Sequence, residues 1–163
     1  MRLPGEKWDY VVLQQGPTST QLNRDTLVIA AKLLDPHIRG AGGRSASLMT
    51  WPASDQRSLF PAVRLSSQLA AQSVGGLFVP AGEAWSRALA ADPQLPLYGA
   101  DGFHPGELGT YLAALVLYER ITGKDARSLP ARAIAGGRTL NVEETTVRLL
   151  QRIAHETSEQ FPR

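Results

Sequence analysis

Two side chains in the glycine-rich segment 97–106 are of types that transfer protons. Asp101 and His104 lie three residues apart, and Pro105 with an apolar run follows them directly. A carboxylate beside an imidazole fixes the tautomer of the ring and stabilises the imidazolium that forms when the ring takes up a proton. This spacing therefore predicts an oriented general base of the kind that acyl transfer requires.

The residues after His104 predict where its ring is held. Because proline disfavours a helical backbone in the residue before it, His104 should stay outside a helix that has Pro105 in its first position. The positive end of the helix dipole disfavours the imidazolium, so the ring should remain able to accept a proton. We expect the pair at the carboxyl end of a sheet, where open α/β folds bind ligands.

The same residues have two other interpretations. Asp101 and Gly102 are typical of a turn, in which case His104 would only cap a helix, and spacing alone does not decide between a site and a turn. Asp101, His104 and Glu107 would instead be metal ligands, since zinc binds carboxylates and imidazoles. A metal is disfavoured because Glu107 already suits the first turn of the helix, so we expect neither a metal nor a cofactor.

The elements that must position the pair alternate along the chain. Apolar runs predict strands at 10–13, 45–50 and 77–79, and helical spacing predicts helices at about 20–38, 58–74, 83–90, 105–121 and 141–159. Pro36 should kink or end the first helix, and Asn141 to Glu144 resembles a capping box. The alternation predicts parallel βαβ units in a three-layer α/β/α sandwich. We expect one domain over 1–163, with 125–163 forming a loop and a C-terminal helix.

Composition excludes several classes of function. The 163 residues carry a formal charge of +2 and no run of Lys and Arg, so we expect no nucleic-acid partner. Cysteine is absent, which excludes disulfides and thiolate metal sites. The first residues lack the apolar core of a signal peptide, and no apolar run approaches the ~18 residues of a membrane span, so we expect no membrane partner. Nothing in the sequence assigns a compartment.

Segment 101–114 resembles the last conserved block of the SGNH/GDSL hydrolases, whose Asp and His complete a Ser-Asp-His triad. Segment 8–17 resembles the third block of that family, a strand and a glycine-containing loop that lines the oxyanion hole. The order and spacing of 49–52 and 79–85 agree with the strands between them, so the resemblance covers about 8–124. It implies a flavodoxin-like fold and a serine ester hydrolase in which Asp101 and His104 are catalytic.

The chain departs from the family pattern at two places. The first block, which carries the nucleophilic serine, and the second block, which carries an oxyanion-hole glycine, are expected upstream of Met1, so the first strand and helix are missing from these residues. The third block usually reads Gly-x-Asn-Asp, whereas here 16–19 reads Gly-Pro-Thr-Ser. Gln14, Gln15 and the backbone at Gly16 remain as oxyanion donors.

Ser19 is an alternative nucleophile, since it lies on the loop after the first strand. However, it lacks the small-residue elbow that exposes a nucleophile, and Thr18 to Thr20 is a good helix-capping sequence. His37 and His155 have no matching carboxylate pattern, so we expect both to face solvent and assign them no role.

The resemblance implies small acyl esters or acetylated carbohydrates as substrates. The competing hypothesis is a non-catalytic remnant, either a pseudoenzyme or a ligand-binding domain that uses the same cleft. Without a first strand, the strand at 10–13 would expose its edge, and an exposed edge can pair with another chain. We therefore expect self-association through this edge.

Overall fold

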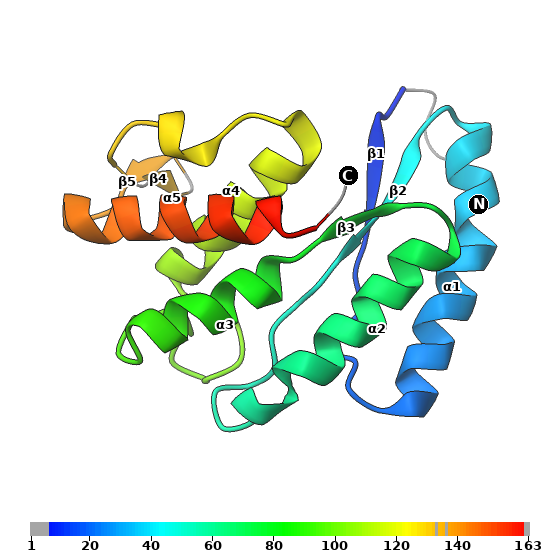
Figure 1. Ribbon diagram of the computed structural model, residues 1–163, viewed down its shortest axis with the longest axis horizontal. Helices are drawn as coiled ribbons and strands as arrows, with labels where there is room; N and C mark the ends of the chain where they lie inside the picture. Colours follow the sequence, from blue (N-terminus) through cyan, green and yellow to red (C-terminus); the bar gives the residue numbers. More distant parts are fainter. Residues whose placement is uncertain (1–6, 133, 136, 162–163) are drawn as a thin grey trace.

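A parallel sheet with helices on both faces organises the molecule (Figure 1). The computed structural model describes residues 7–132, 134–135 and 137–161. Its elements, in chain order, are β1 (Tyr10–Leu13), α1 (Gln21–Gly40), β2 (Arg44–Leu48), the 3-10 turn η1 (Arg57–Leu59), α2 (Phe60–Ser73), β3 (Leu77–Val79), α3 (Ala81–Ala91), α4 (Glu107–Thr122), the 3-10 turn η2 (Ala126–Ser128), β4 (Ile134–Ala135), β5 (Arg138–Thr139) and α5 (Glu144–Glu159).

The strands pair in the order β1-β2-β3, and both pairings are parallel. Leu13 and Ser45 face the layer of α1 and α2, where Ser45 Oγ donates to Asp35 of α1 at 2.7 Å. Side chains alternate along a strand, so Ala46 points to the opposite face. There it joins the main core with Leu112 of α4. The three-layer arrangement expected from the sequence is therefore confirmed.

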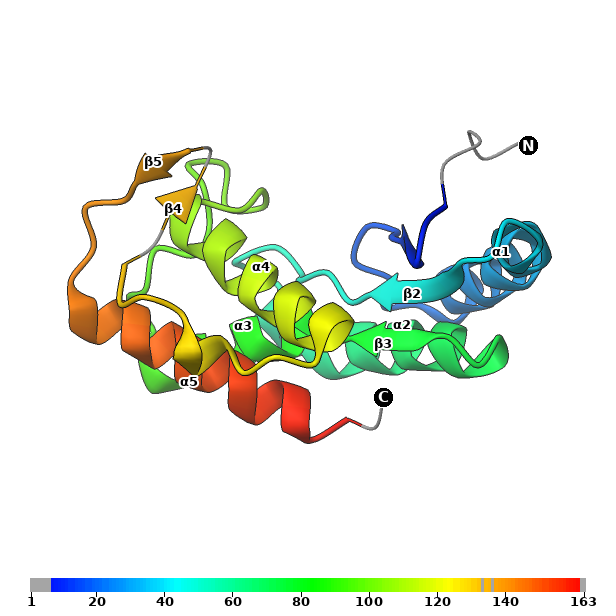
Figure 2. The ribbon, with the colours of Figure 1, turned by 90° about the horizontal axis from the view of Figure 1, so that it is seen from above.

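Helices α3, α4 and α5 gather at the other end of the molecule from α1 and α2 (Figures 1 and 2). Helix α5 packs on α3 and α4, and its buried face includes Val147, Leu150 and Ala154. None of the helices in the described part of the chain combines the length and the apolar character that crossing a membrane requires.

Strand β1 lies at an edge of the sheet. In the described part of the chain it pairs with β2 alone, so the backbone groups on its other side have no partner strand. Val12, on the face toward α4, is 42% exposed, and Trp8 just before the strand is 46% exposed. The sheet thus ends in an apolar, uncovered edge.

Pro36 was predicted to kink or end the first helix, and it does not end it, because α1 continues through Pro36 to Gly40. The proline costs the helix one hydrogen bond, but residues on both sides of it are anchored. Asp35 accepts hydrogen bonds from Arg39 Nε at 2.6 Å and from Ser45 Oγ at 2.7 Å, and Ile38 is only 3% exposed. These contacts hold the helix to Gly40.

Two helix starts also differ from the prediction. Helix α4 begins at Glu107 with Gly106 as its N-cap, because Pro105 forms an antiparallel bridge with Tyr98. Helix α5 begins at Glu144, and its N-cap Glu143 makes no side-chain capping bond, so the capping box predicted at Asn141 does not form. The two-residue strands β4 and β5, which form an antiparallel pair, were not predicted within the loop that precedes α5.

Candidate functional site

The segment 97–106 folds into a closed loop before α4. Gly106 N donates to Leu97 O at 2.7 Å, and Gly99 N donates to His104 O at 2.7 Å. Gly102 at the tip has a φ of +67°, a conformation that side chains with a Cβ rarely adopt. The backbone bonds across the base of the loop fix the position of Asp101 and His104.

This loop is docked on the segment that follows β2. Trp51 Nε1 donates to Phe103 O at 3.2 Å, and Tyr98 Oη donates to Pro52 O at 2.9 Å. Ser54 N donates to Gly102 O at 2.8 Å. Since residues 51–54 continue from the carboxyl end of β2, the loop lies at the end of the sheet where the sequence predicted a site.

Beneath the loop is a stack of aromatic rings. Trp85 of α3 is fully buried and stacks on Trp51 with ring centroids 3.9 Å apart and planes 3° apart. Tyr98 meets the same Trp85 ring edge-on at 4.9 Å. A Cβ at Gly109 would lie 2.3 Å from the Trp85 ring, so only glycine allows α4 to pack this closely. The stack joins α3 and α4 to the loop that carries the candidate pair.

Asp101 binds both the ring and the backbone of His104. Its Oδ2 lies 2.5 Å from His104 Nδ1, while its Oδ1 accepts from Phe103 N at 3.0 Å and from His104 N at 2.9 Å. The structure therefore brings the predicted pair together, and the same carboxylate also stabilises the predicted turn. With Nδ1 engaged, Nε2 is the ring nitrogen left for proton transfer, on a side chain that is 74% exposed.

The hydrogen bonds to Asp101 favour its ionised form. The His104 ring first, and then the backbone N–H groups of Phe103 and His104, lower the pKa of Asp101 from 3.8 to about 2. A carboxylate that stays ionised throughout the physiological range keeps Nδ1 protonated and leaves Nε2 as the acceptor. This is the tautomer that a general base requires.

We predict that His104→Ala raises the Asp101 pKa from about 2 toward 3.8, because the largest of its hydrogen bonds is lost while the backbone donors remain. The folded-state pKa is the lower one, so the contribution of the pair to stability is present above about pH 4 and is lost as the pH falls through about 2. Carbon-13 NMR titration of the carboxyl group measures both values. A native pKa near 3.8 would contradict the predicted bonding.

The predicted oxyanion donors lie on the neighbouring loop after β1. Thr50 Oγ1 donates to Gln15 O at 3.3 Å, and the next residue, Trp51, donates to Phe103 O in the loop that carries His104. Both loops are therefore hydrogen-bonded to the segment that follows β2. Gln14 and Gly16 are exposed, and Gln15 is half-buried. No hydrogen bond or ion pair in the described structure joins Gln14 or Gln15 to the pair.

A cavity of about 310 Å³ lies on the α1–α2 side of the sheet and is a separate feature. Its lining includes Gln14, Gln15, Leu27 and Ala70, but neither Asp101 nor His104. The candidate pair therefore lies outside this cavity, on an exposed loop.

Ser19 was an alternative candidate for the nucleophile, and Glu107 was an alternative candidate for a metal ligand. Thr20 caps α1 by accepting from Asn23 N at 3.3 Å, in agreement with the capping sequence around the half-buried Ser19. Glu107 does not join Asp101 and His104 in a cluster of three close ligand atoms; in the described residues such a cluster forms from Glu119, Asp125 and His155 instead.

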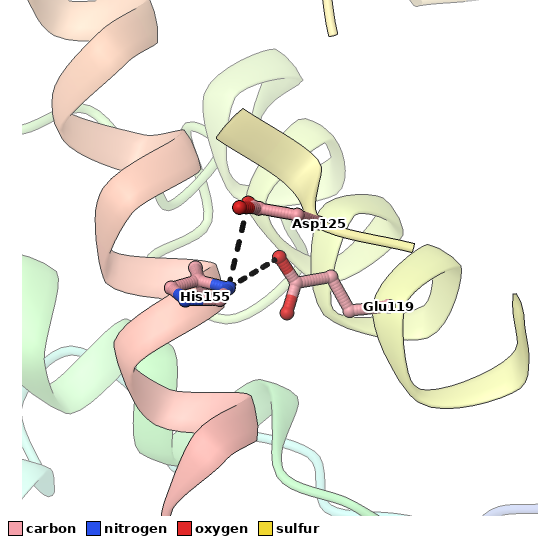
Figure 3. Close-up of side chains that lie close together, drawn as sticks. All are labelled: Glu119, Asp125 and His155. Atoms are coloured by element: carbon pink, nitrogen blue, oxygen red, sulfur yellow. Dashed lines mark hydrogen bonds and ion pairs between the residues drawn. The ribbon is translucent and has the colours of Figure 1, made fainter. Parts of the chain in front are cut away.

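Both His37 and His155 were predicted to face solvent. His37 is exposed, but the prediction was wrong for His155. The His155 side chain is only 19% exposed, and its Nδ1 lies 3.3 Å from Glu119 and 3.4 Å from Asp125 (Figure 3). Sequence spacing gives no signal for this cluster, because Glu119 and His155 are 36 residues apart and meet only when α5 packs on α4.

Comparison with known proteins gives structural likenesses. No protein-family profile matches the chain, and no curated protein sequence matches it. A DUF4886 family protein from Bacteroides uniformis superposes with a TM-score of 0.77 over 93% of this chain at 22% identity. This chain spans 62% of the length of that protein, and the likeness shows the fold.

A second solved structure, described as a candidate SGNH hydrolase from Slackia heliotrinireducens, is 29% identical. The superposition covers 71% of this chain and 67% of the Slackia protein, with a TM-score of 0.57. This likeness supports a relationship to the SGNH hydrolase fold.

Proposed function

We propose that this chain supplies the acid–base half of a serine ester hydrolase of the SGNH type. The observation that carries the proposal is the 2.5 Å contact between His104 Nδ1 and Asp101 Oδ2 on a loop fixed at the carboxyl end of a parallel sheet. The structural likeness to a candidate SGNH hydrolase supports a relationship to that hydrolase fold, on which the proposal builds.

In the proposed reaction a serine hydroxyl attacks the carbonyl carbon of an ester. His104 Nε2 takes the hydroxyl proton as the new C–O bond forms, and Asp101 stabilises the resulting imidazolium. Collapse of the tetrahedral intermediate breaks the bond to the alcohol, which leaves with the proton from His104. Water then attacks the acyl-enzyme by the same proton route, which releases the acid and restores the serine.

The serine is proposed to lie on a strand that pairs with the free edge of β1. The resemblance puts the nucleophile block before segment 8–17 in the chain, and β1 has an unpaired edge on which such a strand can add. Reading the coding sequence in frame upstream of Met1 checks this directly. A predicted strand followed by Gly-x-Ser supports the proposal, and a stop codon or an unrelated sequence contradicts it.

Gln14, Gln15 and the Gly16 backbone are proposed to help hold the oxyanion, because they follow the carboxyl end of β1 and share the Thr50–Trp51 support with the His104 loop. The proposed substrates are small acyl esters or acetylated carbohydrates. Hydrolysis of p-nitrophenyl acetate by the natural gene product tests the reaction class, and acetylated oligosaccharides then test the substrate class.

A second candidate function is ligand binding without catalysis. In the described residues no serine hydroxyl forms a hydrogen bond with His104, which is expected both for a nucleophile outside these residues and for a domain that lacks one. The same assay separates the two. Saturable binding of an ester with no turnover would favour the binding domain, whereas turnover that depends on His104 favours the hydrolase.

When the 163-residue chain is expressed alone, we predict that it self-associates through the edge of β1, because an unpaired apolar edge can accept a strand of another copy. Val12→Lys should reduce the association, since a charge on an edge strand opposes pairing. The matched control is Ile29→Lys at an exposed position of α1 that is away from the edge. Sedimentation equilibrium measures the effect. A wild-type monomer at every concentration would contradict pairing at this edge.

A further inference from the structure

Three potential metal ligands from separate segments meet between the C-terminal parts of α4 and α5 (Figure 3). Glu119 lies near the end of α4, Asp125 directly precedes η2, and His155 lies on α5. Figure 3 shows the two carboxylates turned toward the His155 ring from neighbouring segments. Their three closest ligand atoms all lie within 4.8 Å of one another.

The distances from His155 Nδ1 to the two carboxylate oxygens fit ligands of one cation better than direct hydrogen bonds. His155 Nδ1 lies 3.3 Å from Glu119 Oε1 and 3.4 Å from Asp125 Oδ1. Charge-assisted N–H···O bonds are typically about 2.7–2.9 Å long, so both contacts are long for an imidazolium held by two carboxylates. Nitrogen and oxygen ligands at 2.0–2.2 Å from a tetrahedral zinc ion are separated from each other by about 3.3–3.5 Å.

The burial of the Glu119 carboxylate also favours a cation at this position. Glu119 is 6% exposed, and its Oε1 accepts a hydrogen bond from Ala126 N. Arg127 Nη2 binds Asp125 Oδ2 at 2.7 Å. The other oxygen, Oδ1, approaches His155 and also accepts from Arg127 N at 2.8 Å and from Arg127 Nε at 3.0 Å.

A buried hydroxyl in a residue that lines the same cavity provides an independent observation. Ser158 lines the same cavity of about 160 Å³ as the three ligands, and the residue is 6% exposed. Its Oγ is buried and has no hydrogen-bond partner in the described structure. Buried polar atoms are almost always satisfied, so a bound water or ion is the usual partner of such an atom. A water that completes the coordination of a cation would meet this need.

We propose that Glu119, Asp125 and His155 bind one Zn²⁺ ion, with water as the fourth ligand. An imidazole with two carboxylates is a zinc ligand set, whereas Mg²⁺ and Ca²⁺ prefer oxygen ligands alone. The ion would tie α5 and η2 to the end of α4. The site is separate from the Asp101–His104 pair and does not depend on the proposed hydrolase activity.

Chelator-treated protein tests the proposal when it is titrated with ZnCl₂ in a calorimeter and in thermal unfolding. We expect one Zn²⁺ per chain and a rise in Tm of about 5–10 °C at a free Zn²⁺ concentration a hundredfold above Kd. MgCl₂ should produce no comparable rise. The absence of a saturable zinc site, or a Tm that zinc does not change, would overturn the proposal.

The chain has three histidines, and the two outside the cluster provide matched controls for His155. His155→Ala should weaken zinc binding by about tenfold or more, whereas His37→Ala and His104→Ala should leave the affinity unchanged. Loss of binding in His104→Ala alone would instead assign the ion to the Asp101 loop and overturn the proposal.

Asp125→Asn keeps the shape of a half-buried side chain and should also weaken binding, so the test does not depend on the folding of His155→Ala. The visible absorption of bound Co²⁺ reports tetrahedral coordination in the wild-type protein. Unchanged zinc affinity in Asp125→Asn, or a purely octahedral Co²⁺ spectrum, would contradict the proposed ligand set.

Discussion

Replacing His104 with alanine is expected to lower kcat for ester hydrolysis by the natural gene product by about 10⁴-fold or more. The serine would lose the base that takes its proton, and the alcohol would lose the acid that protonates it. KM should change little, because the 74% exposed ring offers little binding surface to the substrate. Steady-state kinetics with p-nitrophenyl acetate measures both parameters.

Asp101→Asn is expected to cause a loss of similar size, about 10⁴-fold in kcat. An amide at this position can donate to His104 Nδ1, and Nε2 would then carry the proton and no longer accept one. His37→Ala is the matched control, since this exposed histidine lies on α1 and should leave kcat unchanged. If His104→Ala retained wild-type kcat while remaining folded, the proposed role of the pair would be wrong.

The largest expected effect on stability comes from Trp85→Ala, which should lower the free energy of unfolding by about 3–5 kcal/mol. The Trp85 ring is 0% exposed and contacts Trp51 by stacking and Tyr98 by its edge. Its Nε1 also donates to Gly109 O at 3.3 Å, so truncation both leaves a cavity and removes this hydrogen bond. Urea unfolding followed by circular dichroism measures the change.

Trp8→Ala is the matched control, because Trp8 is 46% exposed and its loss should change stability by less than about 0.5 kcal/mol. Trp85→Ala should also loosen the loop of His104, since Trp51 both stacks on Trp85 and donates to Phe103 O. Equal unfolding free energies for the two variants would contradict the central position of Trp85 in this packing.

The strands and the candidate pair were predictable because each depends on local sequence. The apolar runs at 10–13 and 77–79 are strands with those bounds, since parallel strands favour continuous apolar residues. The strand predicted at 45–50 is instead β2 at 44–48, because its partner β3 ends at Val79, which pairs with Leu48. Asp101 and His104 are three residues apart, and the turn between them is held by the Asp101 carboxylate, which binds the backbone N–H and the ring of His104. Such short-range features are set by residue type and spacing.

The features that the sequence did not predict depend on contacts between distant segments. Pro36 lies inside α1 because Asp35 and Ile38 are anchored by residues of β2 and the core. His155 meets Glu119 only through the packing of α5 on α4. No local periodicity encodes either contact, and both required the tertiary structure.

The role of His104 as the base of a serine nucleophile is tested most directly by labelling with a fluorophosphonate probe. The natural gene product and its His104→Ala variant are treated in parallel, and the labelled peptide is identified by mass spectrometry. We predict labelling of one serine on a strand-to-helix turn before segment 8–17, with the rate of labelling strongly reduced in His104→Ala. Labelling of Ser19 would place the nucleophile within this chain instead. No labelled serine, or an equal rate in both proteins, would contradict the proposed hydrolase.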